Sequence, residues 1–253
     1  MRIGEGRPTA EIARESGQGV RVWQVDLRQP AGWVQEAAAA LLEPGERHRH
    51  GRETREVARR RQVARAALRI ALSRWLGCSP RALRFVRDSH GKPGVAGAGA
   101  LHFNLARSGD CCLIAITTIG PIGVDVERAV AVPELQAIAS TRFAPTEAAA
   151  ILRLTGERRV RAFYNCWTRK EAYLKARGVG LGAPLDGVTV TVDDGQPSIV
   201  ALEHDDPDAW SLVTVRPGRG LIGAVAVRGA PYLRGQVITP GTLPLGLRLD
   251  VPA

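Results

Sequence analysis

The sequence predicts an α+β fold, and three observations support this prediction. Several short stretches alternate apolar and polar residues, or form brief apolar runs bounded by glycine and proline, as β-strands do. Two long stretches repeat apolar residues at three- and four-residue steps, which is typical of amphipathic helices. Strands and helices do not alternate regularly, as a doubly wound parallel sheet would require. The 253 residues suffice for one large domain or two of about 120 residues.

The first half of the chain is expected to hold a polar tail, a strand, a long helix and two further strands. In order, these are residues 1–19, 20–27, 53–75, 101–105 and 111–119, with a turn at 107–110 between the last two strands. The tail is expected to be flexible. Gly77 and Pro80 mark the end of the helix. Arg61, Arg65 and Arg69 are four residues apart, so they form a stripe beside its apolar face.

The second half is expected to be richer in helices. A strand at 122–127 precedes helices at 133–140, 145–154 and 157–177, and strands follow at 187–192, 198–202, 211–215 and 221–227. Pro145 is a favoured first residue of a helix. Residues 238–253 are rich in proline, glycine and leucine, and are expected to form a peripheral tail.

The net charge of +10 is unusual and is concentrated in one segment. Residues 46–90 contain thirteen arginines and four acidic residues, a net charge of +9. One side of the molecule should therefore attract anions. Nucleic acid, anionic membranes, acidic proteins and phosphorylated small molecules all remain candidate partners on this basis.

The cysteines and the N-terminus indicate a soluble cytoplasmic protein. Four cysteines without CxxC spacing are too few for a disulfide-rich secreted scaffold. The first residues lack the apolar segment of a signal peptide, and no apolar run approaches about 18 residues. We therefore expect no association with a membrane.

Three carboxylates are the main candidates for chemistry. Asp125 and Glu127 are two apart in an expected strand, so they share a face, and a solvated strand face is the simpler interpretation. Glu171 falls on the inward stripe of the 157–177 helix, where a carboxylate needs a cation, a metal ion or an arginine partner. If this helix packs on the strand, the three carboxylates converge.

Their hard oxygens suit Mg²⁺, with Mn²⁺ as an alternative. Lys175 follows Glu171 by one turn and can reach the same cavity to contact phosphate. Only three of the 35 basic residues are lysines, the others being Lys92 and Lys170, which suggests sites that need a compact ammonium. Together these residues indicate phosphoryl or phosphodiester chemistry.

The motifs resemble those of the 4′-phosphopantetheinyl transferase superfamily, in particular its larger type, which activates peptide and polyketide synthetases. The matching segments are Gly91-Lys92-Pro93, Phe103-Asn104-Leu105-Ala106-Arg107-Ser108-Gly109, Gly123-Val124-Asp125-Val126-Glu127, Arg142-Phe143 with Pro145 and Glu147, Trp167-x-x-Lys170-Glu171-Ala172-x-x-Lys175, and Gly178-Val179-Gly180-Leu181 with Pro184-Leu185. They cover roughly residues 45–230 in the family's order.

The resemblance implies two similar subdomains, residues 20–120 and 121–237, packed as an intramolecular pseudo-dimer with the active site in the cleft between them. It implies transfer of phosphopantetheine from coenzyme A to a serine of an apo acyl or peptidyl carrier protein, with release of 3′,5′-ADP. Coenzyme A and Mg²⁺ would bind in the cleft. The partner would be an acidic carrier, and the enzyme would act as a monomer without nucleic acid.

The resemblance also assigns roles to the carboxylates and to one lysine. Asp125, Glu127 and Glu171 match the family's metal-binding carboxylates. Lys175 matches a cleft lysine near the pyrophosphate of coenzyme A. Glu171 and Lys175 are the candidate catalytic residues, with Glu171 or a water on the metal as the general base.

Three further basic residues would bind coenzyme A by the same resemblance. Lys92 would contact its nucleotide end, and Arg60 would help to hold its phosphates. Arg107 stands where the family commonly has a histidine that contacts the 3′-phosphate, and Ala106 replaces a common serine. Lys170 has no assigned role and is either a surface contact for the carrier or a structural residue.

Two other functions fit part of the pattern. A Mg²⁺-dependent nuclease or phosphodiesterase would use the carboxylates and the positive charge without coenzyme A. A non-enzymatic RNA-binding module would require aromatic side chains among the basic ones, but only 5% of the residues are aromatic. Neither alternative accounts for the Gly-Lys-Pro and Lys-Glu-Ala-x-x-Lys motifs together.

Overall fold

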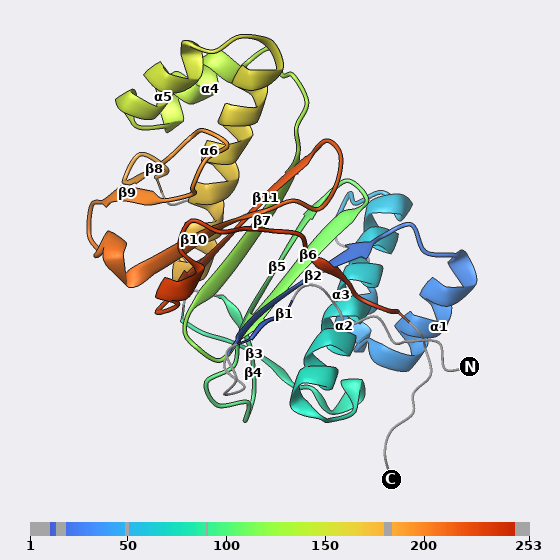
Figure 1. Cartoon of the computed structure of the whole chain (residues 1–253). Coiled ribbons are helices and arrows are strands. Elements are labelled where there is room, and N and C mark those ends of the chain that lie inside the picture. Colours follow the sequence, from blue (N-terminus) through green and yellow to red (C-terminus); the bar gives the residue numbers. More distant parts are fainter. Residues whose placement is uncertain (1–10, 14–18, 49–50, 90, 180–183, 246–253) are drawn as a thin grey trace, which may run out of the picture.

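The computed structural model describes residues 11–13, 19–48, 51–89, 91–179 and 184–245, and it is a mixed helix and strand fold (Figure 1). Its helices are α1 (Ala31–Leu41), α2 (Pro44–Arg47), α3 (Arg55–Leu76), α4 (Leu135–Arg142), α5 (Pro145–Leu152) and α6 (Gly156–Arg177). Its strands are β1 (Glu11–Ala13), β2 (Gly19–Asp26), β3 (Phe85–Arg87), β4 (Pro93–Val95), β5 (His102–Ser108), β6 (Cys111–Thr117), β7 (Ile122–Arg128), β8 (Val188–Val190), β9 (Ile199–Leu202), β10 (Trp210–Val215), β11 (Leu221–Arg228), β12 (Val237–Ile238) and β13 (Gly241–Thr242).

Two sheets form the centre of the molecule. The first has the order β1-β2-β6-β5, with β13 also paired to β2, and the second has the order β12-β10-β11-β7. Neighbouring strands are antiparallel, except that β13 runs parallel to β2 and β12 runs parallel to β10. Each sheet is therefore built mainly from antiparallel strands, as expected for an α+β fold.

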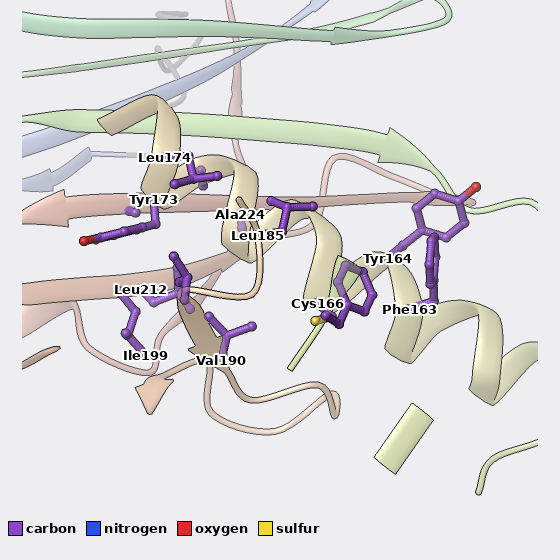
Figure 2. Packing of buried hydrophobic residues seen from close by; sticks show 14 of the residues in the cluster. Phe163, Tyr164, Cys166, Tyr173, Leu174, Leu185, Val190, Ile199, Leu212 and Ala224 are labelled. Carbon is purple, nitrogen blue, oxygen red and sulfur yellow. The ribbon is translucent and has the colours of Figure 1, made fainter. Parts of the chain in front are cut away.

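The buried apolar residues form clusters that define the layers. One cluster joins α3 to the first sheet, a second lies between the two sheets, and a third joins α6 to the second sheet. The helices α3 and α6 accordingly lie on opposite sides of the strands (Figure 1). Figure 2 shows the third cluster, in which Tyr173, Leu212 and Val190 contribute side chains from α6, β10 and β8.

The long helices follow the sequence prediction closely. A helix expected at 53–75 is α3, and its end is set by Gly77, which has a φ of 65° that suits glycine. The helix expected at 157–177 is α6, and Gly178 ends it in the same way with a φ of 74°. The sequence-based boundaries were therefore accurate where a periodic apolar stripe meets a glycine C-cap.

Several elements of the first half were not expected. Residues 11–13, inside the expected flexible tail, form β1 against β2. Helix α1 was not predicted, although Val34, Ala37 and Leu41 are buried at helical spacing. The hairpin of β3 and β4 was missed because each strand has three residues and little buried surface.

The turn expected at 107–110 is shorter than predicted. Strand β5 continues to Ser108, and Arg107 pairs with Cys112 in the ladder to β6. Gly109 alone takes a left-handed φ of 56°, so a tight two-residue connection is enough. Arg107 and Ser108 are consequently strand residues whose side chains lie on opposite faces of the first sheet.

The expected C-terminal tail is not peripheral over its described part. Residues 241–242 form β13, which returns to the first sheet, and Leu243 is 3% exposed in the cluster beneath α3. The segment Gly180-Leu181 of one predicted motif lies outside the described residues. None of the helices in the described part is both long and apolar enough to cross a bilayer.

Candidate functional site

The candidate site lies where β7 meets α6. Val124 and Val126 are fully buried in the cluster between the sheets, so the alternate positions of β7 face α6. At Gly123 the helix is so close that an added Cβ would lie 2.0 Å from the carbonyl oxygen of Ala172. A glycine at this position therefore allows α6 to approach, and this places Asp125 beside the end of the helix.

Asp125 and Lys175 form a partly satisfied ion pair. Asp125 is only 4% exposed, and its Oδ1 lies 2.5 Å from Lys175 Nζ. Its Oδ2 is also buried but accepts no hydrogen bond within the described residues. A buried carboxylate oxygen without a partner carries a substantial desolvation cost, so this atom has unused capacity to bind a cation or a donor.

The two glutamates lie close enough to interact electrostatically with Asp125. Burial raises the pKa of Asp125 from its ordinary 3.8 to about 7, and Lys175 opposes this increase. The negative charges of Glu127 and Glu171 raise it further. Burial likewise raises the pKa of the half-buried Glu171, again with Lys175 opposing and Glu127 adding to the effect. The three predicted carboxylates are thus brought into one electrostatic cluster.

Glu127 is held by a residue of the other sheet. Ser108 Oγ donates a hydrogen bond to Glu127 Oε2 at 2.8 Å and accepts one from the backbone N–H of Arg128 at 3.0 Å. Four residues earlier on the same strand, Asn104 Oδ1 accepts a hydrogen bond from the N–H of Val124 at 3.0 Å. Asn104 and Ser108 therefore attach β5 to β7 and position the Glu127 carboxylate.

The carboxylate cluster fits a hard divalent cation by its chemistry. All the donors are carboxylate oxygens, Asp125 Oδ2 has no partner, and the charges repel one another until a cation neutralises them. As the side chains stand, no three Asp, Glu, His or Cys residues of the described part are grouped closely enough to hold one metal ion. The Lys175 ammonium instead neutralises part of the charge.

Lys92 bridges the two halves of the molecule beside this cluster. Its Nζ donates to the carbonyl oxygens of Ile122 at 3.1 Å and Ala176 at 2.6 Å, at the start of β7 and near the end of α6. Burial lowers its pKa from 10.5 to about 8, and only Asp88 opposes this effect. The lysine is therefore close to the site, with its ammonium engaged by backbone carbonyls.

The other two predicted coenzyme-binding residues occupy different surroundings. Arg60 forms ion pairs with Asp110 at 2.6 Å and with Glu56 at 2.8 Å, and it lies over the turn between β5 and β6. Arg107 is exposed near the end of β5 and has no hydrogen bond or ion pair among the described residues. Of the two, Arg107 has the free guanidinium.

Lys170 is a structural residue, not a surface contact. It is fully buried, and its Nζ lies 2.5 Å from Glu147 Oε2 and donates to the carbonyl oxygens of Leu185 and Val188. Glu147 Oε1 accepts the N–H of Val190 at 2.7 Å. This pair therefore ties α5, α6 and the segment leading into β8 together behind the site.

Sequence reasoning missed three residues that support the site. Asn104 and Ser108 are four apart in β5, so a period of two already puts them on one face, but their contact with β7 was not expected. Glu147 was noted only as a motif match, and nothing in the chain indicates Lys170 as its partner. The spacing of Asn104 and Ser108 could have predicted that they share a face, whereas no spacing could have predicted the contact between Glu147 and Lys170.

Comparison with known proteins agrees with the motifs. A family model described as the 4′-phosphopantetheinyl transferase superfamily matches residues 121–226, which run from the start of β7 into β11. HetI of Nostoc sp. is 32% identical over 213 residues, covering 83% of this chain and 88% of that protein. Sfp of Bacillus subtilis is 31% identical over 165 residues, with 65% and 72% coverage. AcpT of Salmonella typhi is 32% identical over 157 residues, with 62% and 78% coverage.

All three relatives are named 4′-phosphopantetheinyl transferases. The match to HetI covers most of both proteins at a level of identity that indicates common descent. The family predicted from the motifs is thereby confirmed. The chain belongs to the 4′-phosphopantetheinyl transferase superfamily and is an enzyme of this class.

Proposed function

We propose that this protein transfers the 4′-phosphopantetheine group of coenzyme A to a serine hydroxyl of an apo acyl or peptidyl carrier protein, with Mg²⁺, and releases 3′,5′-ADP. The observation that carries this proposal is the half-satisfied Asp125 carboxylate, paired with Lys175 and electrostatically coupled to Glu127 and Glu171. It supplies the oxygen donors and the cation that a pyrophosphate and its metal ion require.

We further propose that the two halves form an intramolecular pseudo-dimer with the substrate between them. Each half has a mainly antiparallel sheet covered by a 22-residue helix, α3 or α6, that ends at a left-handed glycine. The apolar cluster between the sheets supports this arrangement. The carboxylates lie at the junction, because β7 contacts both β5 and α6.

In the proposed mechanism, Asp125, Glu127 and Glu171 would hold Mg²⁺, which neutralises charge on the pyrophosphate when bound. The serine oxygen attacks the phosphorus that bears pantetheine, and the bond from this phosphorus to the bridging oxygen breaks. The leaving oxygen remains with 3′,5′-ADP. Lys175 would move its ammonium from Asp125 to the pyrophosphate and stabilise the leaving group.

Glu171 is the candidate base for the serine proton. Its pKa is raised by burial and by the charge of Glu127, which brings its basicity nearer to neutral pH than that of an exposed glutamate. The proton would move from the serine hydroxyl to a Glu171 oxygen as the new oxygen–phosphorus bond forms. Ser108 keeps Glu127 oriented during this step through its hydrogen bond.

Coenzyme A would extend from the carboxylates toward the first half of the chain. Lys92 would lie at its nucleotide end, where the ammonium already bridges β7 and α6. Arg107 would contact the 3′-phosphate. A role for Arg60 in holding phosphates requires that it exchange its contact with Asp110 or Glu56 for the ligand.

The proposed partner is an acidic carrier protein in the cytoplasm. The enzyme would act on it as a monomer, without nucleic acid or a membrane. The net charge of +9 over residues 46–90 supports the attraction of such a partner. The nuclease alternative shares the carboxylates and the charge, but the relatives compared above are transferases.

The test is to incubate the protein with coenzyme A, Mg²⁺ and several apo-carriers and to weigh the carriers by mass spectrometry. We expect a mass increase of one phosphopantetheine group on at least one carrier, and none on a variant of that carrier whose serine is replaced by alanine. Absence of the increase on every carrier, together with cleavage of DNA or RNA, would replace the transferase by the nuclease.

A further inference from the structure

In the described part of the chain, the outer edge of β7 is paired by side chains of the first half and not by a strand. β7 is the last strand of the second sheet, and its inner edge pairs with β11. Along the outer edge, Asn104 Oδ1 accepts the N–H of Val124 at 3.0 Å, and Ser108 Oγ accepts the N–H of Arg128 at 3.0 Å. Because buried backbone groups need partners, these side chains fix where the strand lies.

Lys92 extends this row of side chains to the start of β7. Its Nζ donates to the carbonyl oxygen of Ile122 at 3.1 Å, two positions before Val124 and on the same edge of the strand. The same ammonium donates to the carbonyl oxygen of Ala176 at 2.6 Å. That carbonyl lies in the last turn of α6, where a helix supplies no donor of its own. One side chain of the first half therefore holds both the strand and the helix.

The two contacts of Lys92 flank the Asp125–Lys175 pair. Ala176 directly follows Lys175, and the contact on β7 lies three residues before Asp125. The strand and the helix are also very close at this point, because a Cβ on Gly123 would lie 2.4 Å from the nitrogen of Ala176. The Lys92 ammonium is therefore bound where a small shift of α6 relative to β7 would move Lys175 away from Asp125.

The turn that carries Lys92 holds the side chain in this position. Asp88 Oδ1 accepts the backbone N–H of Lys92 at 2.9 Å, and the N–H of Asp88 donates to the carbonyl oxygen of Lys92 at 3.0 Å. The stem of the lysine passes beside Gly178, where an added Cβ would lie 3.3 Å from Lys92 Cδ. Glycine at the C-cap of α6 thus leaves room for the stem to reach the end of the helix.

The ammonium of Lys92 is largely occupied by the protein itself. Two of its three N–H donors are used by the carbonyl oxygens of Ile122 and Ala176. Ile122 is fully buried and Ala176 is 2% exposed. If the ammonium turned toward a phosphate, two carbonyl oxygens in buried residues would lose this donor, which is costly. The proposed coenzyme can therefore lie near Lys92 without being bound by its ammonium.

We propose that Lys92 is a positioning residue for the transfer reaction. Its ammonium fixes α6 against β7, and thereby Lys175 against Asp125, and it does not bind the nucleotide of coenzyme A. The effect on transfer rests on the proposed function. The motif resemblance gives this lysine a contact to the nucleotide end, so the two roles predict different results for the same variant.

The direct test measures kcat, the KM of coenzyme A and the Kd of 3′,5′-ADP for the wild-type protein and for Lys92→Met. We expect kcat at saturating carrier to fall at least about tenfold, because small displacements of reacting groups are costly. The KM and the Kd should stay within about twofold of the wild-type values, because no contact to the nucleotide is lost. Arg219→Met is the control, since it removes the same charge from an exposed residue between β10 and β11 and should leave all three constants unchanged.

The wild-type protein allows a second measurement that does not require Lys92→Met to fold. Brief treatment with acetic anhydride, followed by mass spectrometry, measures the acetylation rate of each lysine with and without saturating 3′,5′-ADP. An ammonium held by backbone carbonyls should be acetylated at the same rate in both states. An ammonium that binds the nucleotide should instead be protected when the nucleotide is present.

A rise of about tenfold or more in the Kd of 3′,5′-ADP in Lys92→Met, or protection of Lys92 by the nucleotide, would overturn the proposal. An unchanged kcat in the folded variant would also overturn it, because the position of α6 would then not depend on this contact. A wild-type protein that binds 3′,5′-ADP but transfers nothing to any carrier would refute the proposed function, and the acetylation rates would still decide what the ammonium binds. The two claims therefore fail separately.

Discussion

At the scale of single residues, Asp125 is unusual because one of its oxygens contacts a lysine while the other is buried without a partner. An exposed aspartate would be fully solvated, and a purely structural one would be fully hydrogen-bonded. The neighbouring charges of Glu127 and Glu171 make its ionised form less stable still. These features are typical of a site that is completed by a ligand.

The buried pair of Lys170 and Glu147 gives a prediction about stability. In Lys170→Met the Glu147 carboxylate stays buried without its counter-charge, so we expect the free energy of unfolding to fall by about 3–5 kcal/mol. Adding Glu147→Gln removes that buried charge and should recover at least about 1 kcal/mol. Urea unfolding measures both values.

Arg158→Met is the control for this prediction, because Arg158 lies on the same helix and is exposed. It should change the free energy of unfolding by no more than about 0.5 kcal/mol. If Lys170→Met were equally mild, the lysine would be dispensable for folding and the assignment of a structural role would be wrong.

Lys92 gives a prediction about pH. Its pKa is about 8 in the folded protein and 10.5 when unperturbed, so across that interval the unfolded chain binds more protons than the folded one. Stability from this residue is therefore present above pH 10.5 and is lost as the pH falls through about 8. The wild-type protein should gain stability relative to Lys92→Met between pH 8 and pH 10.5.

Urea unfolding of both proteins at several pH values checks this expectation, and the difference between them cancels the titration of the tyrosines. A difference in the free energy of unfolding that stays constant across the interval would mean that Lys92 keeps an ordinary pKa in the fold.

The sequence predicted the positions of the acidic residues of the site, but it did not predict the burial of Lys170. The shared face of Asp125 and Glu127 follows from the period of two in a strand, and the inward position of Glu171 follows from the helical stripe. Lys170 directly precedes Glu171, so its side chain leaves the helix in a different direction, and the stripe does not predict its burial. Its burial depends on Glu147, which comes from another helix and cannot be inferred as a partner from spacing. Long-range pairing of this kind is decided by how the helices pack, not by local pattern.

At the scale of elements, the junction of β7 and α6 depends on close backbone approach at Gly123. A Cβ there would lie 2.0 Å from the carbonyl oxygen of Ala172 and 2.4 Å from the nitrogen of Ala176. Gly123→Ala should therefore force the helix away from the strand, destabilise the protein by about 1–3 kcal/mol and reduce transfer, because the Asp125–Lys175 contact is stretched.

Gly32→Ala is a suitable control, since an added Cβ in α1 meets nothing within 4 Å. It should leave transfer unchanged and stabilise the protein by up to about 1 kcal/mol. Thermal unfolding and the carrier mass assay check both variants. Wild-type activity and stability in Gly123→Ala would show that the close approach is not needed.

Long periodic elements could be predicted from the sequence, and short or nonperiodic ones could not. The boundaries of α3 and α6 follow from apolar stripes and glycine caps. Strands β3 and β4 have three residues each, so their local patterns are too short to identify them, and α1 was not predicted either. Their formation depends on contacts with α3 and with each other.

At the scale of the whole molecule, the layers place the basic first half and the carboxylate site of the second half in contact. The apolar cluster between the sheets joins them, and Lys92 and β13 add links that local sequence patterns do not reveal. The packing of two similar halves as a pseudo-dimer stays a prediction of the family resemblance, because no periodicity in the sequence indicates it.

The charge of residues 46–90 gives a prediction about association with the carrier. Raising the ionic strength from about 0.01 M to about 0.15 M shortens the Debye length from about 30 Å to about 8 Å. The kcat/KM for an acidic carrier should then fall severalfold, while kcat at saturating carrier changes little. A kcat/KM that does not depend on salt would show that the basic segment does not attract the carrier.

The central claim is that the cluster of Asp125, Glu127, Glu171 and Lys175 transfers phosphopantetheine with a divalent metal ion. The most direct measurement is the initial rate of carrier modification with Mg²⁺ and with a chelator, for the wild-type protein, Glu171→Ala and the exposed control Glu157→Ala. We predict loss of transfer with chelator, a decrease of at least about a hundredfold in Glu171→Ala and a wild-type rate in Glu157→Ala. Wild-type transfer by a folded Glu171→Ala protein, or transfer unaffected by the chelator, would contradict the account.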